Sequence, residues 1–122
     1  VVGRTEHTLT QTAAGYPTIR TLAVDITEPG APAMIVHTAV QAFGRMDVLV
    51  NNAALARPQQ LAEVDPAAVD EQFAVNLRAP FLLAQRTLPG MRARGFGRIL
   101  FFASVAAFTG GIVVHMSKPV QA

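Results

Sequence analysis

Apolar residues occur along the chain in blocks whose spacing alternates between that of strands and that of helices. Short β-branched or continuous apolar runs predict strands at residues 1–2, 18–24, 46–50 and 97–103. Apolar positions three or four residues apart predict helices at residues 5–14, 33–43 and 69–91, and a further helix begins near Lys118. This alternation indicates a parallel sheet joined by right-handed crossovers, which is the α/β fold class.

The third predicted helix carries the most regular pattern. Val69, Phe73, Leu77 and Phe81 follow one another at four-residue steps and form a continuous apolar stripe. Pro80 lies inside this stripe and has no N–H to donate to the preceding turn. We therefore expect the helix to bend or divide near Pro80.

Polar residues follow the predicted strands directly. Arg4 comes just after the first strand, Asp25 ends the second, Asn51 and Asn52 end the third, and Ser104 ends the fourth. The carboxyl ends of parallel strands share one edge of the sheet, where ligands bind in open α/β folds, so this arrangement favours a binding site. Each residue alone also has a structural interpretation: the aspartate could cap its loop, the asparagines could form turns, and the serine could bond its own backbone.

Composition narrows the possible functions. With 122 residues, 51% of them hydrophobic and 15% charged, the chain is one folded domain or part of one. The net charge is +2 and the arginines are scattered singly, which argues against nucleic-acid binding. There is no cysteine, and we predict no metal site. The longest apolar run, about ten residues, is too short to span a bilayer, and no signal-peptide pattern occurs. The chain begins with Val1 and not with methionine, so we expect it to start within a longer protein.

Five stretches in order and in register resemble a known family. They are "VGRT", "LAVDI", "DVLVNNAA", "FAVNLRAPF" and "GRILFFASVAAF". These stretches resemble consecutive signatures of the short-chain dehydrogenases/reductases, and they are similar to those of the bacterial reductases that include 3-oxoacyl-[acyl-carrier-protein] reductase. One departure is that "NNAA" ends in alanine where the family usually has glycine.

The resemblance covers essentially the whole chain but only the middle of the family's domain. It implies that residues 1–122 are the central part of a single NAD(P)-binding domain. The implied fold is a partial doubly wound, Rossmann-like parallel sheet that lacks the first strand and the C-terminal part. In the family's strand order the first strand lies between the second and the fourth. The resemblance therefore implies two strand edges that face a gap.

The resemblance also implies cofactor-binding roles. Arg4 stands where many members keep an acidic residue for the ribose hydroxyls, and its guanidinium can pair with a 2′-phosphate, so NADP is favoured over NAD. A solvated arginine is the structural alternative. Asp25 resembles the aspartate that accepts a hydrogen bond from the adenine amino group, while Ile26 offers its backbone and an apolar wall. Asn52, with Ala53, resembles the contact to the adenine-side ribose.

Three further residues match catalytic positions of the family. Asn76 matches the asparagine that holds a water between the catalytic lysine and solvent. Ser104 matches the serine that hydrogen-bonds the substrate carbonyl and its developing alkoxide. Lys118 matches the end of the Tyr-x-x-x-Lys motif, whose ammonium lowers the pKa of the tyrosine and holds the nicotinamide ribose. A water-facing asparagine and a surface lysine are the structural alternatives. Asn51 is expected to tie adjacent strands together.

Two parts of the family's site are missing from the sequence. The glycine-rich turn that holds the pyrophosphate is absent, and Val114 stands four residues before Lys118, where the tyrosine belongs. In the family the tyrosine follows the serine by about thirteen residues, and this interval counted from Ser104 reaches Ser117. The position counted back from Lys118 is Val114, three residues earlier. A short deletion in the loop explains both this disagreement and the loss of the tyrosine. Loss of a general acid typically costs about 10²–10⁴-fold in rate. His115 is a candidate replacement donor.

The sequence thus predicts an NADP-dependent oxidoreductase fragment that transfers hydride between NADP(H) and a small carbonyl or secondary alcohol. We expect the isolated chain to be inactive. The alternatives are a non-catalytic relative, acting as a nucleotide-binding sensor or assembly subunit, and a partial or frameshifted reading of an ordinary gene. The family further implies a cytoplasmic protein and a homotetramer, formed through the helix at Val69–Met91 and the one near Lys118. No nucleic-acid or membrane partner is expected.

Overall fold

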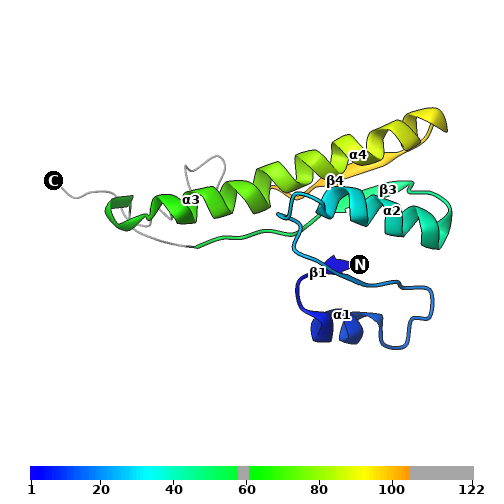
Figure 1. The fold of residues 1–122 in the computed structure, drawn as a ribbon, viewed down its shortest axis with the longest axis horizontal. Coiled ribbons are helices and arrows are strands. Elements are labelled where there is room, and N and C mark those ends of the chain that lie inside the picture. Colours follow the sequence, from blue (N-terminus) through cyan, green and yellow to red (C-terminus); the bar gives the residue numbers. More distant parts are fainter. Residues whose placement is uncertain (58–60, 105–122) are drawn as a thin grey trace.

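A computed structural model describes residues 1–57 and 61–104. Strands and helices alternate along this part of the chain (Figure 1). In order the elements are β1 (Val2–Gly3), α1 (Glu6–Ala13), β2 (Leu22–Ala23), α2 (Ala31–Phe43), β3 (Val48–Asn51), η1 (Leu61–Glu63), α3 (Pro66–Phe73), η2 (Ala74–Arg78), α4 (Ala79–Ala93) and β4 (Arg98–Phe101). The predicted α/β class is confirmed.

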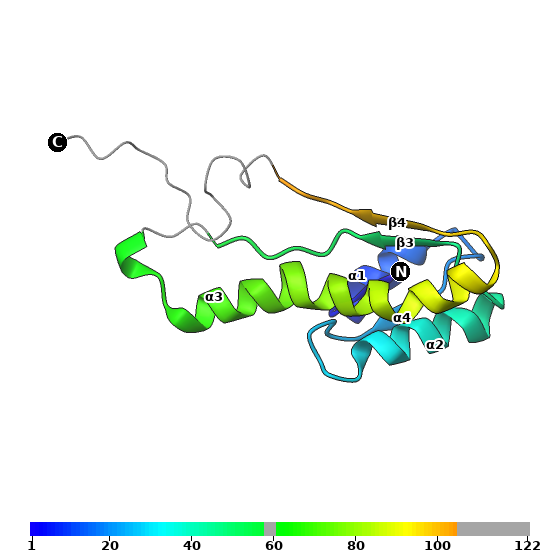
Figure 2. The same cartoon turned by 90° about the horizontal axis from the view of Figure 1, so that it is seen from above.

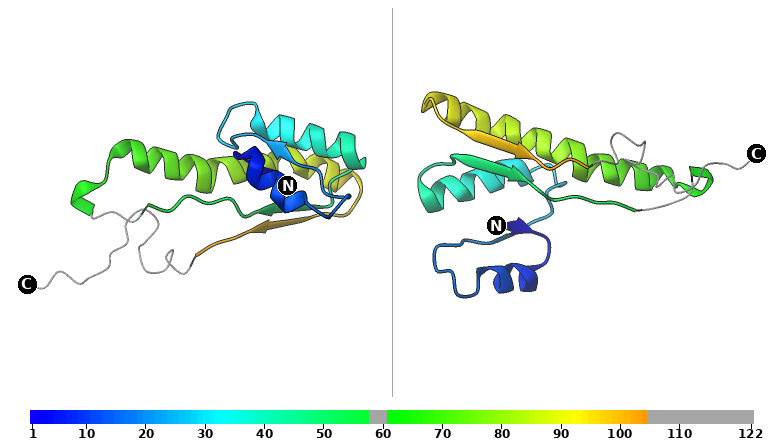
Figure 3. Two further views of the ribbon diagram at one scale, coloured as in Figure 1. Left: turned by 90° about the horizontal axis from the view of Figure 1, so that it is seen from below. Right: turned by 180° about the vertical axis from the view of Figure 1, so that it is seen from behind.

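The described strands form two separate parallel pairs, as the right-hand view of Figure 3 shows. β1 pairs with β2, and β3 pairs with β4 in a register that sets Val50 opposite Leu100. Both pairs are parallel because a helix carries the chain from one end of the sheet back to the other between paired strands. A cavity of about 550 Å³ lies between the two pairs. The expected gap in the sheet is therefore confirmed.

The main core lies between β3 and two helices. Figure 2 shows α2 and α4 side by side on one face of the β3–β4 pair. The buried members of this core are Ala31, Ile35, Leu49, Leu83 and Met91. Each comes from the apolar face of its element, so hydrophobic burial holds α2, β3 and α4 together.

The opposite face of the β3–β4 pair is bare among the described residues. Leu49 is 7% exposed, whereas its neighbours Val48 and Val50 are each 52% exposed, because successive side chains of a strand point to opposite faces. Leu100, opposite Val50, is 43% exposed. Parallel sheets are normally covered on both faces. This sheet has apolar side chains on the uncovered face as well.

The long helical segment changes its winding just before Pro80, as the proline predicts. α3 runs into η2, a π-helical turn, and η2 runs into α4, which starts with Ala79 and Pro80. The segment is continuous (Figure 1). Because Pro80 has no N–H for the carbonyl of Asn76, four residues earlier, the chain widens its turn and does not break.

The apolar stripe of this segment faces outward in the described chain. Phe73, Leu77 and Phe81 are 50%, 60% and 62% exposed. The buried face of the segment carries other residues, some small or polar and some large and apolar, namely Ala68, Gln72, Ala79, Pro80, Leu83, Thr87 and Met91. The stripe is therefore a surface feature of these residues.

Several predicted boundaries were wrong. The strand predicted at 18–24 is only Leu22–Ala23, since the main chain turns at Tyr16 to Ile19 through a hydrogen bond of 3.0 Å between the Ile19 N–H and the Tyr16 carbonyl. α2 begins two residues earlier than predicted, with proline in its first turn, where the missing N–H costs nothing. β4 is shorter than 97–103 because β3 offers a partner over only four residues.

Candidate functional site

Asp25 anchors the turn that follows β2. Its Oδ1 accepts hydrogen bonds from the Thr27 backbone N–H, at 2.9 Å, and from the Thr27 hydroxyl, at 2.7 Å. The bond from the Thr27 backbone, and after it the bond from the Thr27 hydroxyl, lower the pKa of Asp25 below its ordinary value of 3.8. Burial raises this pKa and opposes the shift, whereas the charge of Arg4 lowers it further. Asp25 is therefore a carboxylate near neutral pH, with Oδ1 doubly engaged.

Two arginines reach this turn from different elements. The Nη1 of Arg4, just after β1, lies 3.8 Å from Oδ2 of Asp25. The side chain of Arg4 is 66% exposed, so its remaining donors face solvent. The Nη1 of Arg78, from η2, lies 3.5 Å from the carbonyl of Thr27, a long hydrogen bond. The turn after β2 thus carries two guanidinium groups beside one carboxylate.

Asn76 ties η2 to the segment that follows β3. Its Oδ1 accepts from the Leu55 N–H at 2.8 Å, and its Nδ2 donates to the Leu55 carbonyl at 2.7 Å. The side chain thus occupies both polar groups of one backbone residue. The role expected for Asn76, holding a water near the lysine, would have to use its main-chain carbonyl, because the side chain is committed to Leu55.

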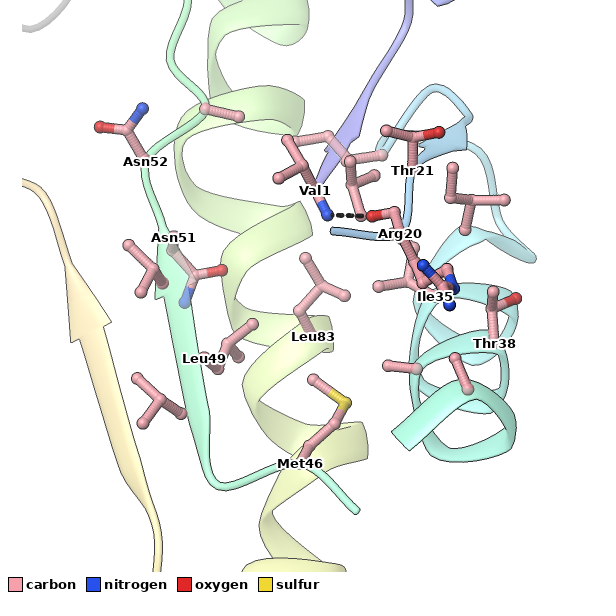
Figure 4. A pocket seen from close by; sticks show the side chains of 18 of the residues that line it. Val1, Arg20, Thr21, Ile35, Thr38, Met46, Leu49, Asn51, Asn52 and Leu83 are labelled. Atoms are coloured by element: carbon pink, nitrogen blue, oxygen red, sulfur yellow. Dashed lines mark hydrogen bonds between the residues drawn. The ribbon is translucent and has the colours of Figure 1, made fainter. Parts of the chain in front are cut away.

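The polar residues at the end of β3 have different environments, because Asn51 is buried and Asn52 is exposed. Asn51 is 8% exposed, and its Nδ2 donates to the carbonyl of Leu100 at 3.4 Å, so it ties β3 to β4 as expected. Asn52, labelled in Figure 4, and Ala53 are exposed, and both line the 550 Å³ cavity together with Ile26. Ile26 also packs against the core. The cavity thus borders three of the residues expected to contact the adenosine.

Only some of the expected catalytic residues are among those that the structure describes. Ser104 is exposed and follows β4, three residues beyond its end. Lys118 lies outside the described residues, as do Val114, His115 and Ser117. The chain's single tyrosine, Tyr16, lies 64% exposed in the turn after α1. No group of three or more metal-ligating side chains occurs in residues 1–57 and 61–104.

Three residues that contact the predicted site residues, or the turn that Asp25 anchors, were not identified from the sequence, namely Thr27, Leu55 and Arg78. Thr27 follows Asp25 by two residues, the spacing of a side-chain turn, and could have been found from that pattern. Leu55 acts through its backbone, which leaves no mark in the sequence. Arg78 could have been suspected from its place between Asn76 and the helix-perturbing proline.

The side chains present fit the adenosine end of a nicotinamide nucleotide. Arg4 has exposed guanidinium donors that could bind a phosphate, Oδ2 of Asp25 contacts Arg4 at 3.8 Å and could accept a further bond, and Asn52 and Ala53 border a cavity. Groups for the pyrophosphate are not among the described residues.

Parallel strand pairs, helical crossovers and polar side chains at the carboxyl strand ends together define a Rossmann-type α/β fold. Comparison with known proteins narrows this class. The sequence profile of the short chain dehydrogenase family matches residues 1–116. The chain belongs to the short-chain dehydrogenase/reductase family, whose members are NAD(P)-dependent oxidoreductases.

Individual relatives agree with this assignment. L-xylulose reductase from Bos taurus is 34% identical over 114 residues, covering 93% of this chain and 45% of the relative. Short-chain reductase protein NovJ from Streptomyces niveus is 37% identical over 111 residues, covering 88% of this chain and 42% of the relative. Among solved structures, the KRED1-Pglu enzyme superposes with a TM-score of 0.79 at 31% identity, over 87% of this chain and 45% of that one. The chain thus spans less than half the length of these relatives.

No helix of the described residues is both long and apolar enough to cross a membrane.

Proposed function

We propose that residues 1–122 supply the adenosine-binding edge, and part of the catalytic edge, of an NADP-dependent oxidoreductase. The observation that carries the proposal is the pairing of Arg4 with Asp25 at the ends of β1 and β2. The carboxylate holds the guanidinium at the strand end, and the donors that remain exposed can bind a 2′-phosphate in bidentate fashion. NAD lacks this phosphate, so Arg4 favours NADP.

The neighbouring residues would position the rest of the adenosine. Asp25 would accept a hydrogen bond from the adenine amino group through Oδ2. Ile26 would form part of the apolar wall, and Asn52 with Ala53 would contact the ribose. Asn76 holds the segment after β3 in place through Leu55, so it would act as a positioning residue for this wall.

The bound nucleotide would supply or accept the hydride. Ser104 would donate a hydrogen bond to the carbonyl oxygen of a small ketone or aldehyde, or accept one from a secondary alcohol. Lys118 would hold the nicotinamide ribose. Since the sequence has valine in place of the tyrosine four residues before Lys118, we propose that this chain alone lacks carbonyl-reductase activity. Measurable consumption of NADPH by the purified chain with a small ketone would contradict this part of the proposal.

The outward stripe fits the expected self-association. Phe73, Leu77 and Phe81 are at least half exposed along one helical segment, and apolar surface of this kind marks interaction sites. We propose that this segment contributes to a homo-oligomer, a tetramer in the complete protein, and that the protein acts in the cytoplasm.

Isothermal titration of the 122-residue chain with NADP⁺ and with NAD⁺ tests the cofactor preference. We expect NADP⁺ to bind more tightly, and Arg4→Ala to weaken NADP⁺ binding about tenfold, since an exposed charge-assisted bond is worth about 1.4 kcal/mol. NAD⁺ binding should not change. Arg45→Ala is the control, because this arginine is equally exposed but pairs with Asp47 at the far end of α2. Equal loss of both nucleotides in Arg4→Ala would reject the 2′-phosphate role.

A second candidate is a non-catalytic relative that binds the nucleotide as a sensor or assembly subunit. Val114 in place of the tyrosine favours it, whereas the presence of Asn76, Ser104 and Lys118 disfavours it. In the same titration, tight NADP⁺ binding without turnover supports the sensor. Absence of binding supports a fragment that functions only within the longer protein.

A further inference from the structure

Four arginines gather at the end of the molecule where β3 and β4 begin. Figure 2 shows that the connection from α2 to β3 and the connection from α4 to β4 lie at the same end. The Nη2 of Arg94 donates a hydrogen bond to the Met46 carbonyl and so joins the two connections. We name the four arginines of these connections the arginine patch: Arg45, Arg92, Arg94 and Arg98.

Asp47 is the only acidic residue that forms an ion pair with the arginine patch in the described structure. Its Oδ2 accepts a hydrogen bond from the Arg45 Nε at 2.8 Å, and its Oδ1 lies 3.7 Å from the Arg94 Nη2. Its main-chain carbonyl accepts from the Arg98 N–H at 2.9 Å, which places Arg98 beside it. Asp47 is also the only acidic residue of residues 29–62, and residues 72–122 contain none. One negative charge therefore accompanies four positive charges.

Arg92 and Arg98 are the two members of the patch that keep donors for a ligand. Both residues are exposed, and neither forms an ion pair within residues 1–57 and 61–104. The Arg98 guanidinium lies over the Phe96 ring, 5.0 Å from its centroid, and its Nη1 donates to the Gly97 carbonyl. Such stacking orients the guanidinium plane and leaves its remaining N–H groups available. The dipole of α4 accounts for a cation in its last turn, but it uses none of the Arg92 donors.

Two exposed phenylalanines beside the patch indicate the kind of ligand. Phe43, the last residue of α2, is 57% exposed, and Phe96 is 50% exposed. A small inorganic anion would leave both rings in water. Two arginines without ion pairs are too few for the row of phosphate contacts on which nucleic-acid binding depends. A peptide with carboxylates beside apolar side chains would pair with the guanidinium groups and also cover the rings.

We propose that the arginine patch binds an acidic segment of another protein, one whose carboxylates stand beside an aromatic or leucine side chain. Arg92 and Arg98 donate to these carboxylates, while Arg45 and Arg94 stay on Asp47 and add to the positive potential. The patch lies at the amino ends of β3 and β4, whereas Asn52 and Ser104 follow their carboxyl ends. The partner therefore binds away from the candidate site, and its binding requires no nucleotide.

An acidic peptide and its neutral counterpart test the proposal. The probe is the fluorescein-labelled, C-terminally amidated octapeptide Glu-Asp-Phe-Glu-Glu-Leu-Asp-Glu, titrated without nucleotide into the 122-residue chain and followed by fluorescence anisotropy. We expect saturable binding in about 50 mM NaCl and binding at least tenfold weaker in about 500 mM NaCl, because salt screens exposed charges. The counterpart, with Gln for Glu and Asn for Asp, should bind at least tenfold more weakly. Absence of binding at about 1 mM acidic peptide, or equal binding of both peptides, would overturn the proposal.

Substitutions on α4 and β4 separate the patch from the general charge of the chain. Arg92→Ala and Arg98→Ala should each weaken binding of the acidic peptide about fivefold, and the double variant about tenfold or more. Arg86→Ala is the matched control, because this arginine is also exposed on α4 and has no ion pair among the described residues. It should change the affinity less than twofold. Equal losses in all three single variants would mean unspecific attraction and would reject the proposal.

Amide chemical shifts of the isotope-labelled parent chain locate the peptide without any substitution. The largest changes are expected in residues 44–47 and 94–98. If they instead occurred around Arg4 and Asp25, the peptide would lie at the nucleotide edge and the proposal would be wrong. Tighter binding of a single-stranded oligothymidylate of about twelve nucleotides than of the acidic peptide would make the patch a nucleic-acid site and would equally overturn it.

Discussion

Gln72 should destabilise the chain, and replacing it with methionine should therefore raise the free energy of unfolding. This residue lies on the buried face of α3 and is 1% exposed. Neither its Nε2 nor its Oε1 has a hydrogen-bond partner within the described structure. In the described structure, burial therefore leaves both polar atoms of this amide without a hydrogen bond.

The size of the effect follows from the state of the amide. A buried polar group without a partner costs about 1–3 kcal/mol, and methionine has nearly the length and flexibility of glutamine with no group to satisfy. We therefore expect Gln72→Met to add about 1–3 kcal/mol to the free energy of unfolding. With a urea m-value of about 2 kcal/mol/M, the midpoint should rise by about 0.5–1.5 M.

Thr87 offers a control of opposite character on the same helical segment. It is 3% exposed, but its hydroxyl donates to the Leu83 carbonyl at 2.8 Å. Thr87→Val removes a satisfied group, so stability should stay the same or fall by about 1 kcal/mol. Both variants are compared with the parent chain by urea denaturation followed by circular dichroism. A midpoint that is unchanged or lower in Gln72→Met, alongside the expected Thr87→Val result, would show that the amide has a partner and would refute the reasoning.

Four further substitutions test other parts of the structure. Asn76→Ala removes two hydrogen bonds to an exposed backbone and should cost about 1–2 kcal/mol in urea denaturation, whereas an unchanged midpoint would mean that water replaces both bonds without loss. The carboxylate of Asp25, whose folded pKa is lowered, stabilises the fold above its ordinary pKa of 3.8, and this contribution is lost as the pH falls through the folded value. Asp25→Asn should therefore be less stable than the parent by about 1 kcal/mol at pH 7, and this difference should shrink as the pH falls below 3.8, so a difference that stays constant in acid would contradict this sign. Gly97→Ala forces a methyl group against the buried methionine beneath it and should cost about 1–3 kcal/mol, while Gly90→Ala, in a helix interior with only a flexible arginine tip nearby, should gain about 0.5–1 kcal/mol, so equal shifts in thermal midpoint would reject the packing argument.

The periodic elements could be predicted because their own residues determine them. The helical spacing that starts at Ile35 predicts α2, and Ile35 is buried in the core together with Leu49 of β3; the continuous apolar run predicts the strand β3, although only Leu49 of its apolar residues is buried. The strand predicted at 18–24 failed for the opposite reason. A strand exists only where a neighbour pairs with it, and β1 offers two residues. No property of Thr18 or Ile19 reveals this.

The candidate site likewise contains residues that could be predicted from the sequence and contacts that could not. Asp25 and Ser104 could be proposed from their places at strand ends, and the pairing of Asp25 with Arg4 agrees with the expectation that strand ends meet. The bond between Asn76 and Leu55 joins residues 21 positions apart through the backbone of one of them, so no residue pattern encodes it. The orientation of the apolar stripe was likewise hidden, because a four-residue apolar spacing is the same whether the stripe faces a partner element or solvent.

The π-helical turn of η2 also determines how the chain should respond to insertions and deletions. Each residue advances an α-helix by about 100°, so the extra residue accommodated in this wide turn sets the rotation of all of α4 relative to α3. Deleting a single residue within Ala74–Arg78 would regularise the winding locally, yet it would rotate Leu83, Thr87 and Met91 away from β3. Inserting or deleting one residue at this turn should therefore be more disruptive than most substitutions. The segment should tolerate changes of side chain far better than changes of length.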